Sequence, residues 1–198
     1  MMTRNNYYAG VLSILLGISL IAGTFPVNTY AAENVNYNNA DITISSAEEL
    51  VEFSKNAVAD SYTEGKIIAI TKDIDLTGVD FKPIAVLAGT LDGNGHVISG
   101  FSLTEASSES GFIGSVVSGA SVIDLTVKGK IAPDGGAENI GGIAGVNNGF
   151  IKGCSFEGSL VANEAAGGIV GHNEKEGQIV GCENKGIILA KRRTGGVT

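Results

Sequence analysis

Acidic side chains that could bind a cation lie in the stretch before residue 95. Asp73 and Asp75 alternate with apolar residues, so both should project from the same side of a strand. Two such carboxylates could make a weak Ca²⁺ contact, because Ca²⁺ is bound by carboxylate and carbonyl oxygens. The alternative, which we favour, is that they solvate a turn and a sheet edge. Asp80 and Asp92 are the other acidic candidates, and Asp92 with Asn94 is expected to cap its own turn.

Two histidines could serve as zinc ligands or as a base. A zinc protease needs two His at helical spacing with a Glu between them. His96 is followed by Val97-Ile98-Ser99, and His172 lies 76 residues further on. We therefore predict no metal site, and we interpret both histidines as turn or wall residues of the fold.

Basic residues are too scattered for chemistry on acidic sugars. No Arg occurs between Arg4 and Arg192, and the short cluster 191–193 is interpreted as a solvated turn. The scattered lysines are Lys66, Lys72, Lys82, Lys128 and Lys130. The sequence therefore assigns no catalytic, cofactor-binding or metal-binding residue, and we expect no cofactor and no enzymatic activity from this chain.

Cys154 and Cys182 occur at equivalent places, 28 residues apart. In adjacent parallel strands their Cα atoms would be ~4.8 Å apart, within the range of a disulfide. A disulfide also prefers Cβ atoms ~3.8 Å apart, which in-register side chains do not provide. We predict two buried, reduced thiols, with a disulfide as the alternative.

These residues are carried by an internal repeat. The segment 141–147, Gly-Gly-Ile-Ala-Gly-Val-Asn, returns at 167–173 as Gly-Gly-Ile-Val-Gly-His-Asn and begins again at Gly195. A repeat of this length indicates a solenoid, in which each unit stacks on the previous one. The third copy stops before its second apolar segment, so we expect the natural protein to continue past Thr198. We also expect this open end to self-associate or to fray from Gly167 onward.

An earlier unit can be aligned with the repeats. Gly111–Gly114 matches Gly142–Gly145, and the extra length lies in a turn-rich loop at 133–137. Asn147 and Asn173 occupy matching turn positions, where stacked Asn side chains can bond to neighbouring backbone. The positions expected to point inward are Leu125, Ile143, Ile151, Cys154, Ile169, Ile179 and Cys182.

One helix is predicted, from Ser46 to about Asp60. Ser46 and Glu49 form a capping box. Leu50, Phe53, Ala57 and Val58 follow at helical spacing and give one apolar face, which we expect to cover the first coil. From Lys66 onward the chain reads as short strands with tight turns and contains no further predicted helix.

The segments Asp73-Ile74-Asp75-Leu76, Pro83-Ile84 and 89–98 together resemble the opening of right-handed parallel β-helices of the pectin-lyase-like class. The Gly-Gly-Ile-x-Gly-x-Asn … Ile-x-x-Cys repeats resemble the Glug motif. This motif is found in secreted and surface proteins of bacteria and in non-catalytic regions of IgA-specific zinc metallopeptidases. The resemblance covers about residues 42 to 198. It implies an all-β, right-handed parallel β-helix in an extracellular setting, and it implies no agreed activity.

The first 31 residues have the layout of a secretory signal peptide, with an apolar run from Ala9 to Gly23 and small residues before a cleavage point after Ala31. We predict a disordered spacer at 32–41, a cap with the helix at 42–62, and the parallel β-helix at 63–198. Removing the leader leaves 12 basic and 21 acidic residues, a net charge of −9. Nucleic acid is therefore an unsuitable partner, and no membrane span is expected after cleavage.

These features favour a non-catalytic β-helix module of a bacterial cell-surface or secreted protein, possessing a binding or adhesion function. The expected partner is an extracellular glycan or protein, and the expected location is extracellular, including the cell wall. The alternative is an accessory region of a larger secreted enzyme, either a metallopeptidase or a polysaccharide-active protein. The sequence following Thr198 would distinguish the two.

Overall fold

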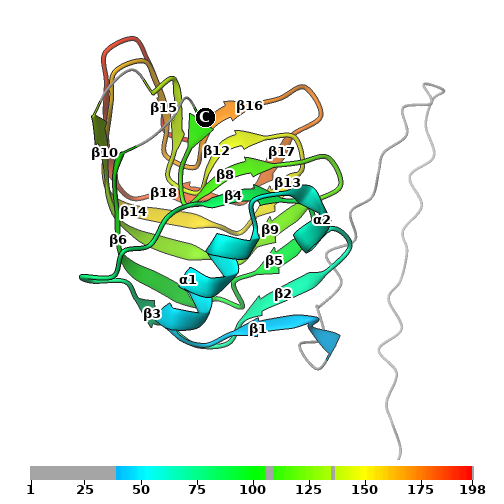
Figure 1. The fold of residues 1–198 in the computed structure, drawn as a ribbon. Coiled ribbons are helices and arrows are strands. Elements are labelled where there is room, and N and C mark those ends of the chain that lie inside the picture. Colours follow the sequence, from blue (N-terminus) through cyan, green and yellow to red (C-terminus); the bar gives the residue numbers. More distant parts are fainter. Residues whose placement is uncertain (1–38, 106–108, 135–136, 198) are drawn as a thin grey trace, which may run out of the picture. The chain divides into compact units, whose positions relative to one another are not determined.

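The computed structural model describes residues 39–105, 109–134 and 137–197. The predicted signal peptide and residues 32–38 of the predicted spacer lie outside these described residues. The described chain folds as a mostly β parallel solenoid of about five turns (Figure 1). This confirms the predicted parallel β-solenoid with a short helix near its N-terminal end.

Sheets A and B are the two long walls of the solenoid. Sheet A contains, in spatial order, β1 (Ile42–Ile44), β2 (Ile67–Ile70), β5 (Thr90–Asp92), β9 (Ser121–Ile123), β13 (Phe150–Lys152) and β17 (Gln178–Val180). Sheet B contains β3 (Ile74–Asp75), β6 (Val97–Glu105), β10 (Thr126–Asp134), β14 (Ser155–Ala162), β18 (Glu183–Asn184) and β19 (Ile187–Ala190). All of their strand pairs are parallel.

Sheets C and D are shorter and complete each turn. Sheet C contains β4 (Ile84–Leu87), β8 (Ile113–Val116), β12 (Ala144–Asn147) and β16 (Val170–Asn173). Sheet D contains β7 (Glu109–Ser110), β11 (Asn139–Gly141), β15 (Ala165–Gly167) and β20 (Arg193–Gly195). The chain passes from A to B, then D, then C, and returns to A one level higher. The first turn goes from B to C directly.

The register predicted from the repeats is confirmed. Ile151 pairs with Val122 on one side and with Ile179 on the other. Ala144 pairs with Ile113, which is the offset expected from the aligned glycines. The loop predicted to hold the extra length accounts for only part of it. Three of the five extra residues of the longer unit lie between Ile131 and Asn139, and the other two lie in the turn between β8 and β9. Both insertions lie outside the paired inward positions, so these stay in phase.

The core is a set of aliphatic ladders with one aromatic cluster. Ile68, Leu91, Val122 and Ile151 follow one another on sheet A, and all are fully buried. On the opposite side the rings of Phe81, Phe101 and Phe112 lie 5.4–5.9 Å apart between centroids. No single unit could bury such residues alone, and stacking of units supplies the missing contacts.

The corner between sheets A and B is formed by one residue with left-handed backbone conformation. Asp124, Gly153 and Gly181 occupy this corner in successive turns, with φ of 48°, 63° and 62°. Glycine adopts this conformation without steric cost. The next residue then faces inward, which places Leu125, Cys154 and Cys182 in one ladder.

Helix α1 (Ala47–Asn56) lies across the first turn (Figure 1). Leu50, Phe53 and Ala57 are buried, as predicted. The Ser54 hydroxyl donates a 2.5 Å hydrogen bond to the carbonyl of Lys82 and so joins the helix to the segment before β4. The Ser46 hydroxyl caps the helix by accepting from the Glu49 amide at 3.3 Å, while the Glu49 carboxylate accepts from the Ser45 amide at 2.6 Å.

Two details of the helix prediction were wrong. Val58 is 66% exposed and does not belong to the apolar face. The helix ends at Asn56, because Ala57 leaves helical geometry with ψ of 54°. The chain then forms a separate short helix, α2 (Asp60–Thr63), before β2.

The inward face of the last turn is only half covered. Ile179, Cys182 and Ile188 pack against the core, yet they stay partly exposed, whereas Ile151 and Cys154 in the turn below are buried. These residues therefore point inward, as predicted for Ile179 and Cys182, but the last turn leaves them partly exposed. Residues 165–170 are all buried, whereas residues 171–197 are all partly or fully exposed. Fraying from Gly167 onward stays a prediction. Association through this end stays a prediction.

Candidate functional site

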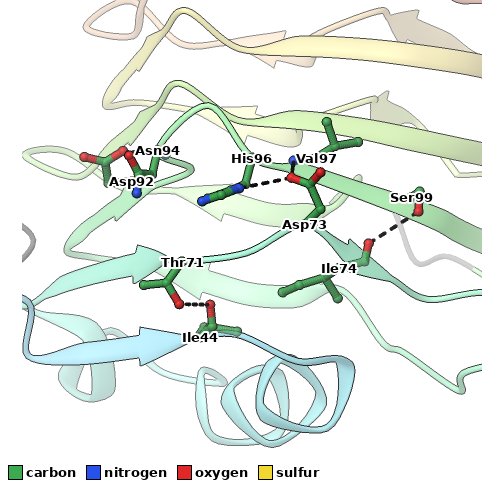
Figure 2. A network of polar contacts seen from close by, with 9 residues as sticks. All are labelled: Ile44, Thr71, Asp73, Ile74, Asp92, Asn94, His96, Val97 and Ser99. Atoms are coloured by element: carbon green, nitrogen blue, oxygen red, sulfur yellow. Dashed lines mark hydrogen bonds and ion pairs between the residues drawn. The ribbon is translucent and has the colours of Figure 1, made fainter.

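Asp73, the first candidate Ca²⁺ ligand, is engaged in a local network (Figure 2). Its Oδ1 accepts a 3.0 Å hydrogen bond from the Val97 amide and lies 3.0 Å from Nδ1 of His96. The Val97 amide, followed by the His96 ring, lowers the pKa of the Asp73 carboxyl. Asp73 thus joins the start of β3 to the start of β6, one turn above. His96 is a wall residue, as predicted.

Asp75 and Asp92 are also used by their own turns. Asp75 Oδ1 accepts from the Thr77 hydroxyl at 2.7 Å and from the Thr77 amide at 2.9 Å, which lowers the Asp75 pKa. Asp92 is buried, and its Oδ1 accepts from the Asn94 amide at 2.8 Å, confirming the predicted turn cap. Among the described residues, no group of three or more His, Cys, Asp or Glu side chains could hold a metal ion. The structure therefore gives Asp73, Asp75 and Asp92 roles in turns and at a sheet edge, which is the interpretation favoured from the sequence.

The two cysteines lie in adjacent turns as free thiols, but they differ in environment. Cys154 is buried and Cys182 is partly exposed. The neighbouring Cys154 side chain lowers the Cys182 pKa to about 7, while the pKa of Cys154 is raised by the same contact and by burial. The prediction that both thiols are protected was wrong for Cys182.

A polar hollow of about 270 Å³ opens where sheets C and D meet near the last turns. Its lining includes Asn139 of β11, Ala165 of β15 and Arg193 of β20, which are successive rungs of one ladder in sheet D. Because Ala165 has a short side chain between two long ones, the wall is recessed at this rung. His172 of β16 lines the side formed by sheet C. We call this feature the Asn139–Arg193 hollow.

Backbone hydrogen bonds fix the rungs of this hollow. The Ala165 amide donates to the Glu138 carbonyl at 3.0 Å, and the Arg193 amide donates to the Glu164 carbonyl at 3.2 Å. His172 Nε2 lies 3.5 Å from a carboxylate oxygen of Glu174, and the His172 side chain is 53% exposed. The hollow thus brings a guanidinium, an imidazole and a side-chain amide from three successive turns to one opening.

The two neighbouring arginines differ in their ion pairing. Arg192 Nε lies 3.2 Å from the Glu164 carboxylate, and Arg192 is not part of the lining. Among the ion pairs of the described residues, none involves Arg193. Arg193 is also exposed, so a ligand in the hollow can reach its guanidinium.

The hollow was not predicted from the sequence. The structure pairs His172 with Val146, which pairs with Ser115 on its other side. Arg193 was placed in a solvated turn, whereas the structure starts β20 there. A signal was present, because extending the match of Gly195 to Gly167 back by two residues aligns Arg193 with Ala165 and Asn139. The alignment alone does not reveal the recess, because the recess also requires β16 of sheet C to lie beside these strands of sheet D.

The chain is similar to Halomucin of Haloquadratum walsbyi, with 28% identity over 144 residues. The similar region covers 65% of this chain, and the chain spans only about 2% of the length of that curated relative. No family model matches the chain, so the resemblance to the Glug motif rests on the repeat residues alone. No solved structure matches the chain significantly.

The described part of the chain was also searched for membrane spans. Neither of its helices has the length and apolar character needed to cross a bilayer.

Proposed function

We propose that this chain is an exported, non-catalytic β-solenoid module of a cell-surface or secreted protein, and that it binds an extracellular ligand through its wall. The observation that carries the proposal is the Asn139–Arg193 hollow, an open polar recess built by successive turns of a rigid stack. Binding residues held on regular strands keep their geometry better than residues on free loops.

Two further observations support the proposal. The first 31 residues have the layout of a secretory leader. The Glug-like repeats resemble those of secreted and surface proteins. The fold itself supports many unrelated functions, so the binding role is argued from the hollow and not from the solenoid.

The test is binding of the purified chain, without its leader, to an array of extracellular glycans and matrix proteins. We expect saturable binding to at least one component. The matched variant is Ala165→Leu, which fills the recess while leaving the strand pairing of β15 in place. It should keep the circular dichroism spectrum of the wild type and lose the binding. Absence of saturable binding to every component, or equal binding by a folded Ala165→Leu variant, would contradict the proposal.

A further inference from the structure

We propose that the Asn139–Arg193 hollow binds a single sugar unit that carries one carboxylate, with Arg193 as the group that recognises the carboxylate. This inference rests on the proposed function and names the ligand class of the same site. It follows from the spacing of the rungs, the availability of Arg193 and the charges around the opening.

The rungs set the size of the ligand. Asn139 and Arg193 are two rungs apart, with Ala165 between them, and parallel strands are ~4.8 Å apart, so the two backbones are separated by roughly 10 Å. The volume of about 270 Å³ lies just below the ~300–1,000 Å³ of pockets for drug-sized ligands. A hollow of this size suits one ring with its substituents and not a long chain.

Arg193 supplies the recognition of an acid. A guanidinium presents a planar fork of N–H donors that matches a carboxylate through two parallel hydrogen bonds. Arg192 is already paired with Glu164 at 3.2 Å, so Arg193 is the arginine whose guanidinium can bind the carboxylate of a ligand. A neutral ligand would leave the guanidinium without a charged partner.

The remaining lining favours a sugar over a bare carboxylate ion. Asn139 and His172 line the same opening, and a side-chain amide and an imidazole can both hydrogen-bond to ring hydroxyls. An amide both donates and accepts, as sugar hydroxyls also do. An ion as small as acetate could reach Arg193 but would leave these groups to water.

The surrounding charge argues against a polyanion. The chain carries a net charge of −8. The Glu164 carboxylate lies beside Arg192 and the Glu174 carboxylate beside the His172 imidazole, and both glutamates adjoin lining residues of the hollow in sequence. A polymer with a carboxylate on every unit would be repelled by these carboxylates. The ligand should therefore carry isolated carboxylates separated by neutral units.

The experiment compares three probes by NMR titration of the isotope-labelled chain without its leader. Methyl β-D-glucuronide and methyl β-D-glucoside differ only in the carboxylate, and acetate supplies the charge without the ring. We expect saturable shifts at Asn139, Ala165 and Arg193 with the glucuronide, and affinities at least ~10-fold weaker for the glucoside and for acetate, which is the scale of one charge-assisted hydrogen-bonded pair.

The variants assign the effect to one side chain. Arg193→Ala should weaken glucuronide binding ~10-fold or more, and Arg193→Lys should restore only part of it because an ammonium cannot form the fork. Arg192→Ala removes the same charge one residue away and should bind like the wild type. If Arg193→Ala does not fold, Asn139→Ala tests the opposite rung and should reduce binding of both sugars.

Each result decides a different claim. Equal affinity for glucuronide and glucoside, or equal loss in Arg192→Ala and Arg193→Ala, would overturn the carboxylate role of Arg193. Acetate binding as tightly as the glucuronide would overturn the sugar. If any of these results occurs while the chain still binds a component of the array, the proposed function stands and only the ligand class is wrong. If the chain binds no component of the array, both the proposed function and this inference are wrong.

Discussion

The side-chain amide of Asn147 donates a 2.7 Å hydrogen bond to Oδ1 of Asn173, its partner one turn further on. Asn147 is fully buried, and its Oδ1 accepts from the Gly149 amide at 3.1 Å. Asn173 in turn donates to the Gly177 carbonyl at 2.8 Å. The two amides therefore satisfy the backbone of both turns between sheets C and A while linking one turn to the next.

Replacing Asn147 by Ala should destabilise the chain by about 1–3 kcal/mol, because it leaves a buried Gly149 amide and the Asn173 oxygen without this partner. Asn148→Ala is the matched control, since it changes the neighbouring residue of the same type. Urea denaturation of both variants measures the difference. Equal midpoints for the two would show that the ladder contributes nothing.

The register of the stack is tested by charge at an inward position. Ile169 is fully buried between turns, so Ile169→Asp buries an unpaired carboxylate and should cost several kcal/mol, roughly 3–5. Lys175→Asp on an exposed turn should cost about 0.5 kcal/mol or less. Lys152 in β13 is partly buried and is therefore less suitable as an exposed control. Similar denaturation midpoints for the two variants would refute the assigned register.

The two cysteines should react at different rates. With a pKa of about 7, the partly exposed Cys182 is ionised to a large extent at neutral pH, and the thiolate is the reactive form. Iodoacetamide should modify Cys182 in the folded chain with a rate that rises through about pH 7, and should reach Cys154 only after unfolding. Peptide mass spectrometry at several pH values measures both sites. Preferential labelling of Cys154 would contradict the assignment.

Acid should weaken the outer wall of sheet B. Glu157 lies 2.7 Å from Lys128 one turn below and 3.8 Å from Lys185 one turn above, and the hydrogen bond from Lys128 is the main cause of its lowered pKa. A lowered folded-state pKa adds stability that is present above the ordinary Glu value of ~4.3 and is lost as the pH falls through the folded-state value.

Glu157→Gln should therefore lose less stability than the wild type between pH 7 and pH 3. The measurement is the urea midpoint of each protein at the two pH values, and Glu176→Gln at an exposed turn is the control. Asp73 and Asp75 also have lowered pKa values, so both proteins should keep some acid sensitivity. An identical pH dependence in wild type and Glu157→Gln would exclude this ion pair as a contributor.

The leader is predicted to be removed after Ala31, because Thr29 and Ala31 provide the small residues that signal peptidase reads. Sequencing of the exported chain from its N-terminus should give Ala32 first. An exported product that still contains Arg4 would contradict the prediction.

The repeats predicted the fold well because solenoid packing is local and repetitive. Matching glycines, the Ile151 ladder and the Asn147–Asn173 pair recur at fixed spacing, so each rung could be aligned without knowing the rest of the fold. The end of helix α1 was missed because it depends on how Ala57 meets β4, where the Val86 amide bonds to the Ala57 carbonyl.

The site could be predicted only in part. The turn roles of Asp92 and His96 follow from their local sequence. The Asn139–Arg193 hollow depends on a short side chain, Ala165, lying between two long ones and on the lateral approach of His172 from another sheet. The exposure of Cys182 depends on what covers its turn, and spacing along the sequence does not specify that.

Binding without catalysis is tested most directly by following one mixture over time. The chain without its leader is incubated with methyl β-D-glucuronide and with oligosaccharides that contain single glucuronate units, and NMR spectra of chain and sugars are recorded over a day. We predict saturable shifts at Asn139 and Arg193 with unchanged sugar signals throughout. New signals from unsaturated sugars or new reducing ends that disappear in Arg193→Ala, or a complete lack of shifts in the chain, would contradict this.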